Sequence, residues 1–403
     1  MGLESTNHTA SPHQTVRRAL DHEIGDPAGL RMLKLAVGVH VLIAALATIQ
    51  RLVVGSQINN FLIFRGSFFH LLSGQDLYAA YPLEHFDFYK YSPTWALLFA
   101  PFALPPVPVG LVLWNVVNAG VLAIAMTRLL PARAAAFALG IVFFEALGAV
   151  QNAQSNGLAA ALMIFALIAS EHAQPRAGAF SIAVGTSIKL FPIGAGLFGV
   201  LARPCWRHVG WCVAAGAILL ALPLAVTSFD TLLTQYASWR AISARDTLSI
   251  EQAWVGGIVE TYLGRAVPHG PFQVAGVLWM LASSAYASRA WDHPTVRRLL
   301  LASLLGFATI FNHKGESPTY VIAFAGIGIW WSIMPRARWR DVIVLAAFVL
   351  GSLGGTDLFP RAYRVAYHHG WQLKALTASL AWVAMQWDLW RTIRRPSLSH
   401  TNA

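Results

Sequence analysis

The chain has 403 residues, of which 56% are hydrophobic and only 12% are charged, and its formal net charge is +11. Soluble globular domains carry roughly 25% charged residues, so these totals exclude a string of soluble domains and indicate one polytopic membrane domain. A nucleic-acid partner is disfavoured, because Lys and Arg collect in the cytoplasmic loops of membrane proteins and set their orientation. Cys205 and Cys212 match no zinc spacing, and we predict neither a metal site nor a cofactor.

Both ends of the chain are polar. Residues 1–30 hold no apolar run that would serve as a signal peptide. We therefore predict cytoplasmic tails at 1–30 and 394–403, on either side of a membrane domain at 31–393.

Apolar segments follow one another through that domain and predict an all-α polytopic bundle of about 12 membrane segments. Several are shorter than the ~20 residues that cross a bilayer, but short helices can pack inside a bundle. The run at 94–104 leads into prolines and is predicted to be re-entrant. The segments lie near 33–53, 107–127, 134–150, 157–170, 177–190, 191–202, 209–227, 271–288, 299–312, 318–334, 341–355 and 373–390.

Charge predicts the topology. With the N-terminus inside, the inside segments and Lys34 at the inner end of the first span hold 18 of the 29 Lys and Arg residues, and the C-terminus is also inside. The parity depends on Pro192, which interrupts a helix and leaves Lys189 at the outer face between two short helices. The outside loops then lie at 54–93, 151–156, 228–270, 311–318 and 356–372.

The first outside loop is too polar to cross a bilayer and is rich in tyrosine. Its carboxylates are candidates for acid–base chemistry, although the Asp-Leu-Tyr context of Asp76 suggests a turn. Most aromatic residues near membrane ends form an interfacial belt, so the tyrosines have that alternative role. The residues concerned are Asp76, Glu84 and Asp87, with Tyr78 and Tyr91.

Three further polar features fall on the predicted outer face. The amides of QNAQSN (Gln151, Asn152, Gln154, Asn156) suit sugar hydroxyls or the cap of a helix that begins near Asn156. Lys189 either binds an anion or extends to the interface. FNHKGESP holds His313, Lys314 and Glu316, which form either a site or an ordinary polar turn.

Cations beside carboxylates at this depth suit a lipid-linked sugar donor. Lys189, His313 and Lys314 would bind its phosphate through charge-assisted hydrogen bonds and stabilise the leaving group. A nearby carboxylate would take the proton from the acceptor hydroxyl.

The ordered set of motifs resembles glycosyltransferase family 87. The stretches that carry the resemblance are LLSGQDLYAAYPLEHFDFYKYSP with the following LWNVVN, then QNAQSNGLAAALMIFALIA, IKLFP and FNHKGESPTYVIA, spread over residues 58–335. The resemblance implies a GT-C fold and an enzyme that uses polyprenyl-phosphate sugars, mannose in the best known cases. It implies no metal or other cofactor.

One position departs from the family pattern. The family's acceptor-activating Asp usually opens the first loop, where this chain has Asn60, and an amide is no general base at neutral pH. Asp87 is our preferred base, Glu84 and Asp76 are alternatives, and Glu316 is a fourth. Asn60 can still hydrogen-bond the acceptor.

The expected function is therefore inverting transfer of a hexose from a polyprenyl-phosphate donor to an acceptor hydroxyl, and the resemblance implies mannose as that hexose. The expected place is the outer face of the cytoplasmic membrane, with a lipid-linked or glycan acceptor. A non-catalytic subunit that binds lipid-linked sugar is one alternative, which the Asn60 departure keeps open. A transporter is another, but it needs charges along a path between the faces, and Glu145 is nearly alone within the spans.

The later outside loops carry more carbohydrate-compatible residues. Segment 228–270 mixes aromatics with acids and amides, among them Trp239, Glu251 and Gln252, and is equally compatible with an amphipathic helix on the membrane. Segment 356–372 adds arginines and the pair His368 and His369, to which we assign no role.

Overall fold

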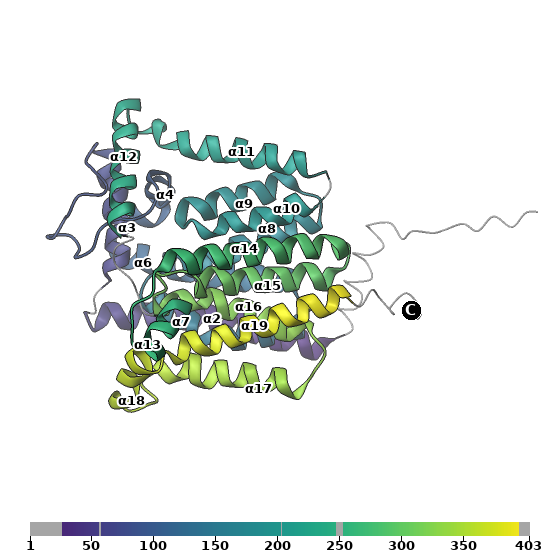
Figure 1. The fold of residues 1–403 in the computed structure, drawn as a ribbon. Coiled ribbons are helices and arrows are strands. Elements are labelled where there is room, and N and C mark those ends of the chain that lie inside the picture. The colour runs from purple at the N-terminus through teal and green to yellow at the C-terminus, as the bar shows by residue number, and fades with distance from the viewer. Residues whose placement is uncertain (1–25, 56–57, 203, 247–252, 395–403) are drawn as a thin grey trace, which may run out of the picture.

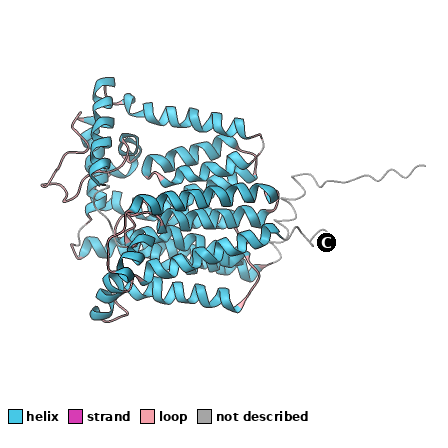
Figure 2. Ribbon diagram, in the orientation of Figure 1, coloured by secondary structure: helices cyan, strands magenta, loops and turns pink. Residues whose placement is uncertain are grey.

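The computed structural model describes residues 26–55, 58–202, 204–246 and 253–394 (Figure 1). All regular secondary structure among these residues is helical (Figure 2). The predicted all-α class is therefore confirmed. Most of the predicted tails, at 1–25 and 395–403, and the loop residues Glu251 and Gln252 lie outside the described residues.

Four described helices are long and apolar enough to cross a membrane by length and composition: Pro27–Val53, Val107–Leu129, Ala132–Gln151 and Cys205–Ala225. The first three are α2, α6 and α7, and the fourth joins α11 (Cys205–Ala221) to the short turn η2 (Leu222–Ala225). Further helices run beside them in Figure 1: α8 (Asn156–Glu171), α9 (Pro175–Ile188), α10 (Gly196–Leu201), α14 (His269–Ala287), α15 (Pro294–Ile310), α16 (Tyr320–Ile333), α17 (Arg338–Ala346) and α19 (Leu373–Arg394).

Polar contacts join turns that are far apart in sequence at one end of the bundle. Asp26, the N-cap of α2, forms an ion pair with Arg133 at the start of α7. Ser332 near the end of α16 donates to the carbonyl of Ala134. Arg340 at the start of α17 binds Asp388 of α19 through two hydrogen bonds of 2.7 Å. This end, which we call the C-terminal end, therefore holds the turns predicted to lie inside.

The opposite end, which we call the site end, carries helices that do not follow the bundle direction (Figure 1). Part of the predicted first loop is in fact a helix, because α3 covers Asn59–Leu72. The predicted re-entrant run 94–104 forms two short helices. The helices of this end are α3, α4 (Pro93–Leu98), α5 (Ala100–Ala103), α12 (Phe229–Asp246), α13 (Val255–Leu263) and α18 (Arg361–Val365).

The predicted break at Lys189–Pro192 is confirmed. Helix α9 ends at Ile188, and Lys189 has an extended backbone with φ −144° and ψ 146°. The chain continues through the 3-10 turn η1 (Phe191–Ala195) into α10. Gly185 allows this reversal, because a Cβ at that position would lie 2.8 Å from the Pro192 ring. The break places Lys189 at the site end.

Small residues let α16 approach its neighbours closely. A Cβ on Gly326 would lie 2.6 Å from the carbonyl oxygen of Ala302 in α15, and one on Gly328 would lie 3.0 Å from that of Ala138 in α7. Membrane helices commonly pack through such small residues. The loop 311–319 between α15 and α16 is therefore held on a closely packed pair of helices.

Candidate active site

The amide segment QNAQSN turns the chain sharply after α7. Ala153 has φ 49°, in the left-handed region that a non-glycine residue rarely adopts. The amide of Gln154 donates to the carbonyl of Ala149, and that of Ala153 to Val150, which is the Schellman arrangement at a helix C-terminus. The indole of Trp114 donates to the Ala153 carbonyl at 2.9 Å. This turn aims Gln154 and Asn156 at the loop 311–319.

The predicted helix start at Asn156 is correct, but the segment's own side chains do not cap it. Ser155 is the N-cap residue of α8 and makes no capping hydrogen bond. Asn118 of α6 accepts from the amide of Leu158 at 3.0 Å instead. Capping therefore does not explain the amides of Gln154 and Asn156, which are left for other contacts.

Asn156 connects Lys189 to the loop 311–319. Its side-chain oxygen accepts from the Lys189 ammonium at 2.6 Å, and its nitrogen donates to the carbonyl of Pro318 at 3.0 Å. Burial lowers the pKa of Lys189 to about 8, partly offset by the negative charge of Glu316. Within the described part of the chain, one of the three N–H groups of this ammonium has a hydrogen-bond partner.

Glu316 shares this region with Lys189. Its carboxylate accepts from the amide of Gln154 at 3.1 Å, while the residue stays exposed. Gln154 is 7% exposed, and its buried side-chain oxygen has no hydrogen-bond partner among the described residues. An acceptor without a donor is unfavourable when buried, so this oxygen is suited to a ligand hydroxyl.

Tyr91 lies against the same carboxylate. Burial, and then the charge of Glu316, raises the pKa of its phenol well above the usual range, so the hydroxyl stays protonated. The next residue, Ser92, donates to the carbonyl of Ser187 at 2.7 Å, which ties this part of the first loop to the end of α9. Tyr91, Gln154, Asn156, Lys189 and Glu316 therefore form one cluster, which we call the central site.

The first-loop carboxylates have partners of their own. Asp87 is exposed, accepts from the amide of Phe88 and forms an ion pair with Lys90 at 3.2 Å. Glu84 contacts the ring of His70 at 3.2 Å. Asp76 accepts from the amide of Tyr78 at 3.0 Å, as the predicted turn requires, and from Ser238 of α12 at 3.2 Å.

Other predicted residues make contacts of their own. The ring of His313 hydrogen-bonds Gln273 at 2.6 Å and stacks on His269 with centroids 4.4 Å apart. The amide of Lys314 donates to the side chain of Asn312. Gln151 is half-buried at the end of α7, and the hydroxyl of Tyr78 donates to the Tyr91 carbonyl at 2.8 Å.

Asn60 makes a hydrogen bond that requires the N–H donor of an amide side chain. Its amide nitrogen donates to the carbonyl of Asn152 at 2.8 Å, which joins α3 to the QNAQSN turn. An ionised Asp has no hydrogen to donate and would set a negative charge against that carbonyl. Asn60 therefore positions the turn.

Helix α12 packs on the first loop. Gln235 accepts from the amide of Leu77 and donates to the carbonyl of Gln75, and the indole of Trp239 donates to the carbonyl of Lys90. These three hydrogen bonds hold the first loop against α12.

The side chains of His368 and His369, in segment 356–372, lie outside the described part of the structure.

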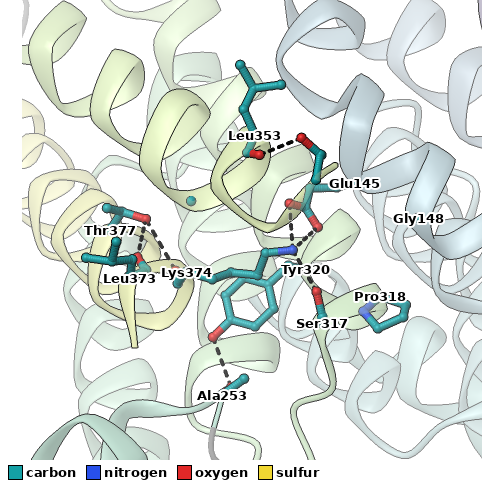
Figure 3. Close-up of polar contacts among 12 residues, drawn as sticks. Glu145, Gly148, Ala253, Ser317, Pro318, Tyr320, Leu353, Leu373, Lys374 and Thr377 are labelled. Atoms are coloured by element: carbon teal, nitrogen blue, oxygen red, sulfur yellow. Dashed lines mark hydrogen bonds and ion pairs between the residues drawn. The ribbon is translucent and has the colours of Figure 1, made fainter. Parts of the chain in front are cut away.

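The sequence did not reveal a buried charged residue that contacts this loop. Lys374, in the first turn of α19, binds both carboxylate oxygens of Glu145 and the hydroxyl of Ser317 (Figure 3). The isolated glutamate within a span was the only available signal, because buried acids need a partner. Through Ser317, the pair contacts the loop that carries Glu316.

The fold and the site together define a helical membrane protein with a polar site at one end of the bundle. The family model described as glycosyltransferase family 87 matches residues 88–311, more than half of the chain. The chain therefore belongs to glycosyltransferase family 87, and it is a glycosyltransferase. The matched range includes Tyr91, the QNAQSN turn and Lys189, whereas Asn60, Asp87 and Glu316 lie outside it.

No curated protein matches the chain. Among solved structures, the fold is similar to ArnT from Cupriavidus metallidurans bound to undecaprenyl phosphate, with 15% identity, a TM-score of 0.40, and coverage of 89% of this chain and 77% of that chain.

Proposed function

We propose that the protein transfers a hexose, mannose in the first instance, from a polyprenyl-phosphate donor to an acceptor hydroxyl. The reaction occurs at the outer face of the cytoplasmic membrane, so the site end faces outward and the positively charged turns face the cytoplasm. The choice of mannose and of a polyprenyl phosphate rests on the family resemblance. The acceptor is a lipid-linked saccharide or a glycan.

The observation that carries the proposal is the pairing of functions in the central site. A lysine with two uncommitted N–H groups among the described contacts lies within the electrostatic reach of an exposed carboxylate. Gln154 hydrogen-bonds the carboxylate at 3.1 Å and Asn156 hydrogen-bonds the lysine at 2.6 Å, which holds the two charged groups in one cluster. A cation for the donor phosphate and a carboxylate for the acceptor are what glycosyl transfer from a lipid phosphate requires.

The reaction is a single displacement. The acceptor oxygen attacks the anomeric carbon, the bond from that carbon to the phosphate oxygen breaks, and the polyprenyl phosphate leaves. Lys189 stabilises the charge on the leaving phosphate through charge-assisted hydrogen bonds. The acceptor proton passes to a carboxylate, and one displacement inverts the anomeric configuration.

We assign the base role to Glu316 ahead of Asp87. Asp87 already has a charged partner of its own, because Lys90 lies 3.2 Å from its carboxylate. Glu316 is exposed to an incoming acceptor and is positioned by Gln154. Glu84 is occupied by His70, and Asp76 by its turn.

The experiment is sugar transfer in membranes from radiolabelled polyprenyl-phosphate-mannose. Wild type is compared with Glu316→Gln, Asp87→Asn and Lys189→Ala, at equal protein levels. We expect loss of transfer of ~10²-fold or more for Glu316→Gln and Lys189→Ala, and a small change for Asp87→Asn. Matched controls are Asp230→Asn on exposed α12 and Lys34→Ala on α2, both outside the site.

The outcomes separate the assignments. Loss in Asp87→Asn with retention in Glu316→Gln would return the base to the first loop. Inactivity of wild type with the mannose donor, but activity with another polyprenyl-phosphate sugar, would change the sugar and keep the mechanism. Retention of the anomeric configuration in the product would reject single displacement.

A further inference from the structure

The ion pair between Glu145 and Lys374 is buried deep in the bundle and is used by no step above. Lys374 Nζ lies 2.9 Å from one carboxylate oxygen of Glu145 and 3.0 Å from the other. The side chains are 3% and 11% exposed. The pair joins α7 to α19, and Figure 3 shows the lysine extended between Glu145 and Ser317.

Stability alone is a weak reason for such a pair. Removing two charges from water costs about as much as their attraction returns, so apolar replacements are often neutral or stabilising. Lys374 is also the second residue of α19, where a cation meets the positive end of the helix dipole. The role of the pair therefore depends on the residue that it holds in place.

What it holds is Ser317. The third N–H of Lys374 donates to the Ser317 hydroxyl at 2.8 Å, and a lysine ammonium has three such groups. All three are thus committed, which makes Lys374 unavailable to a donor phosphate. Ser317 opens the 3-10 turn η4 (Ser317–Thr319) and directly follows Glu316.

The turn is fixed on two sides. Asn156 donates to the carbonyl of Pro318 from the side of the QNAQSN segment, and Lys374 donates to Ser317 from the side of α19. The amide of Thr319 also donates to the carbonyl of Glu316. The backbone that carries Glu316 is therefore attached to two separate parts of the bundle.

We propose that Glu145 and Lys374 are positioning residues that hold Glu316, through Ser317, in the orientation needed for acceptor activation. The kinetic part of this inference rests on the proposed function, whereas the attachment itself does not. A base displaced by a fraction of an ångström loses much of its rate advantage. Lys189 reaches this turn only through Asn156 among the described contacts, so we expect donor binding to change less than kcat.

The sharpest variant is Ser317→Ala, which removes the attachment and leaves the ion pair. We expect kcat to fall about tenfold, since one hydrogen bond to a charged group is lost, with a smaller change in the KM for the polyprenyl-phosphate donor. Ser317→Thr keeps the hydroxyl and should retain most of the activity. A Ser317→Ala variant with wild-type kinetics would overturn the proposal.

A second variant tests whether the three residues act as a unit. The double variant Glu145→Gln/Lys374→Met removes both charges together, which avoids an unpaired buried charge. It should reproduce the kcat of Ser317→Ala, and adding Ser317→Ala to it should change nothing further. Additive losses would mean that Ser317 and the ion pair act independently, which contradicts the proposal.

A measurement without turnover separates this inference from the proposed function. Cys205 and Cys212 are the two native cysteines and are replaced by Ser, and Glu316→Cys introduces one reactive thiol. Its alkylation rate should rise several-fold on adding Ser317→Ala or the double variant, but not Ser317→Thr. Equal rates would refute the attachment even in an active enzyme, and a raised rate in a chain that transfers no sugar would reject only the proposed function.

Discussion

Two lysines of this molecule, Lys374 buried and Lys189 half-buried, differ in how many of their N–H groups have partners. Lys374 directs its three N–H groups at two oxygens of Glu145 and at Ser317. Lys189 has one hydrogen bond, to Asn156, within the described part of the chain, and burial lowers its pKa to about 8. The fully paired lysine is suited to holding the Ser317 turn in place, and the partly paired one to binding an anion.

The largest expected effect is on stability, and it comes from replacing Lys374 alone. Lys374→Met leaves the Glu145 charge buried without its partner, which typically destabilises a protein by about 3–5 kcal/mol. We expect a fall in the melting temperature of the purified protein in detergent, followed by fluorescence-detected size exclusion. The Glu145→Gln/Lys374→Met variant is the control and should melt near wild type. A Lys374→Met protein as stable as wild type would mean that the pair carries no structural role.

The same substitution at the other lysine should spare the fold. Lys189→Met removes an incompletely satisfied cation, so we expect an unchanged or higher melting temperature with transfer reduced ~10²-fold. Direct binding of the polyprenyl-phosphate donor should weaken in parallel. If Lys189→Met loses stability as Lys374→Met does, the contrast between the two lysines is false.

The lowered pKa of Lys189 predicts a dependence on pH. The ammonium is protonated below pH 8 and binds the phosphate, and it loses its charge as the pH rises through about 8. The donor KM should be flat below that pH and rise by about tenfold per unit well above it, because a phosphodiester does not titrate there. Lys189→Arg keeps its charge, so its KM should stay flat. A rise in KM that persists in Lys189→Arg would assign the titration to another group.

The comparison also shows what the sequence could predict. The break at Pro192 follows from local chemistry, so the position of Lys189 at the helix end was predictable. Lys374 and Glu145 are 229 residues apart, and their contact depends on how α7 and α19 pack. No sequence pattern along either helix predicts this contact.

The sequence could not identify which carboxylate is the base, for a similar reason. Asp87 and Lys90 stand three residues apart, so their ion pair is local, but whether it forms depends on the loop conformation. Glu316 and Gln154, which are in contact, are 162 residues apart in the sequence. Residue types identified the candidates, and tertiary packing decides which of them meets Lys189.

Substitutions of Asn60 have the smallest expected effect on transfer, and the direction of the change in Asn60→Asp distinguishes two locations for the base. Its amide donates to the Asn152 carbonyl, so Asn60→Asp replaces a hydrogen bond with a repulsion next to the QNAQSN turn. We expect transfer to fall a few-fold, in line with a net loss of about 1 kcal/mol. Asn60→Ala, which loses the bond without adding charge, is the matched control and should fall less. An increase in transfer for Asn60→Asp, measured with the same labelled donor, would mean that a carboxylate at the start of α3 can serve as the base, and the reacting centre would then lie between α3 and Lys189 instead of beside Glu316.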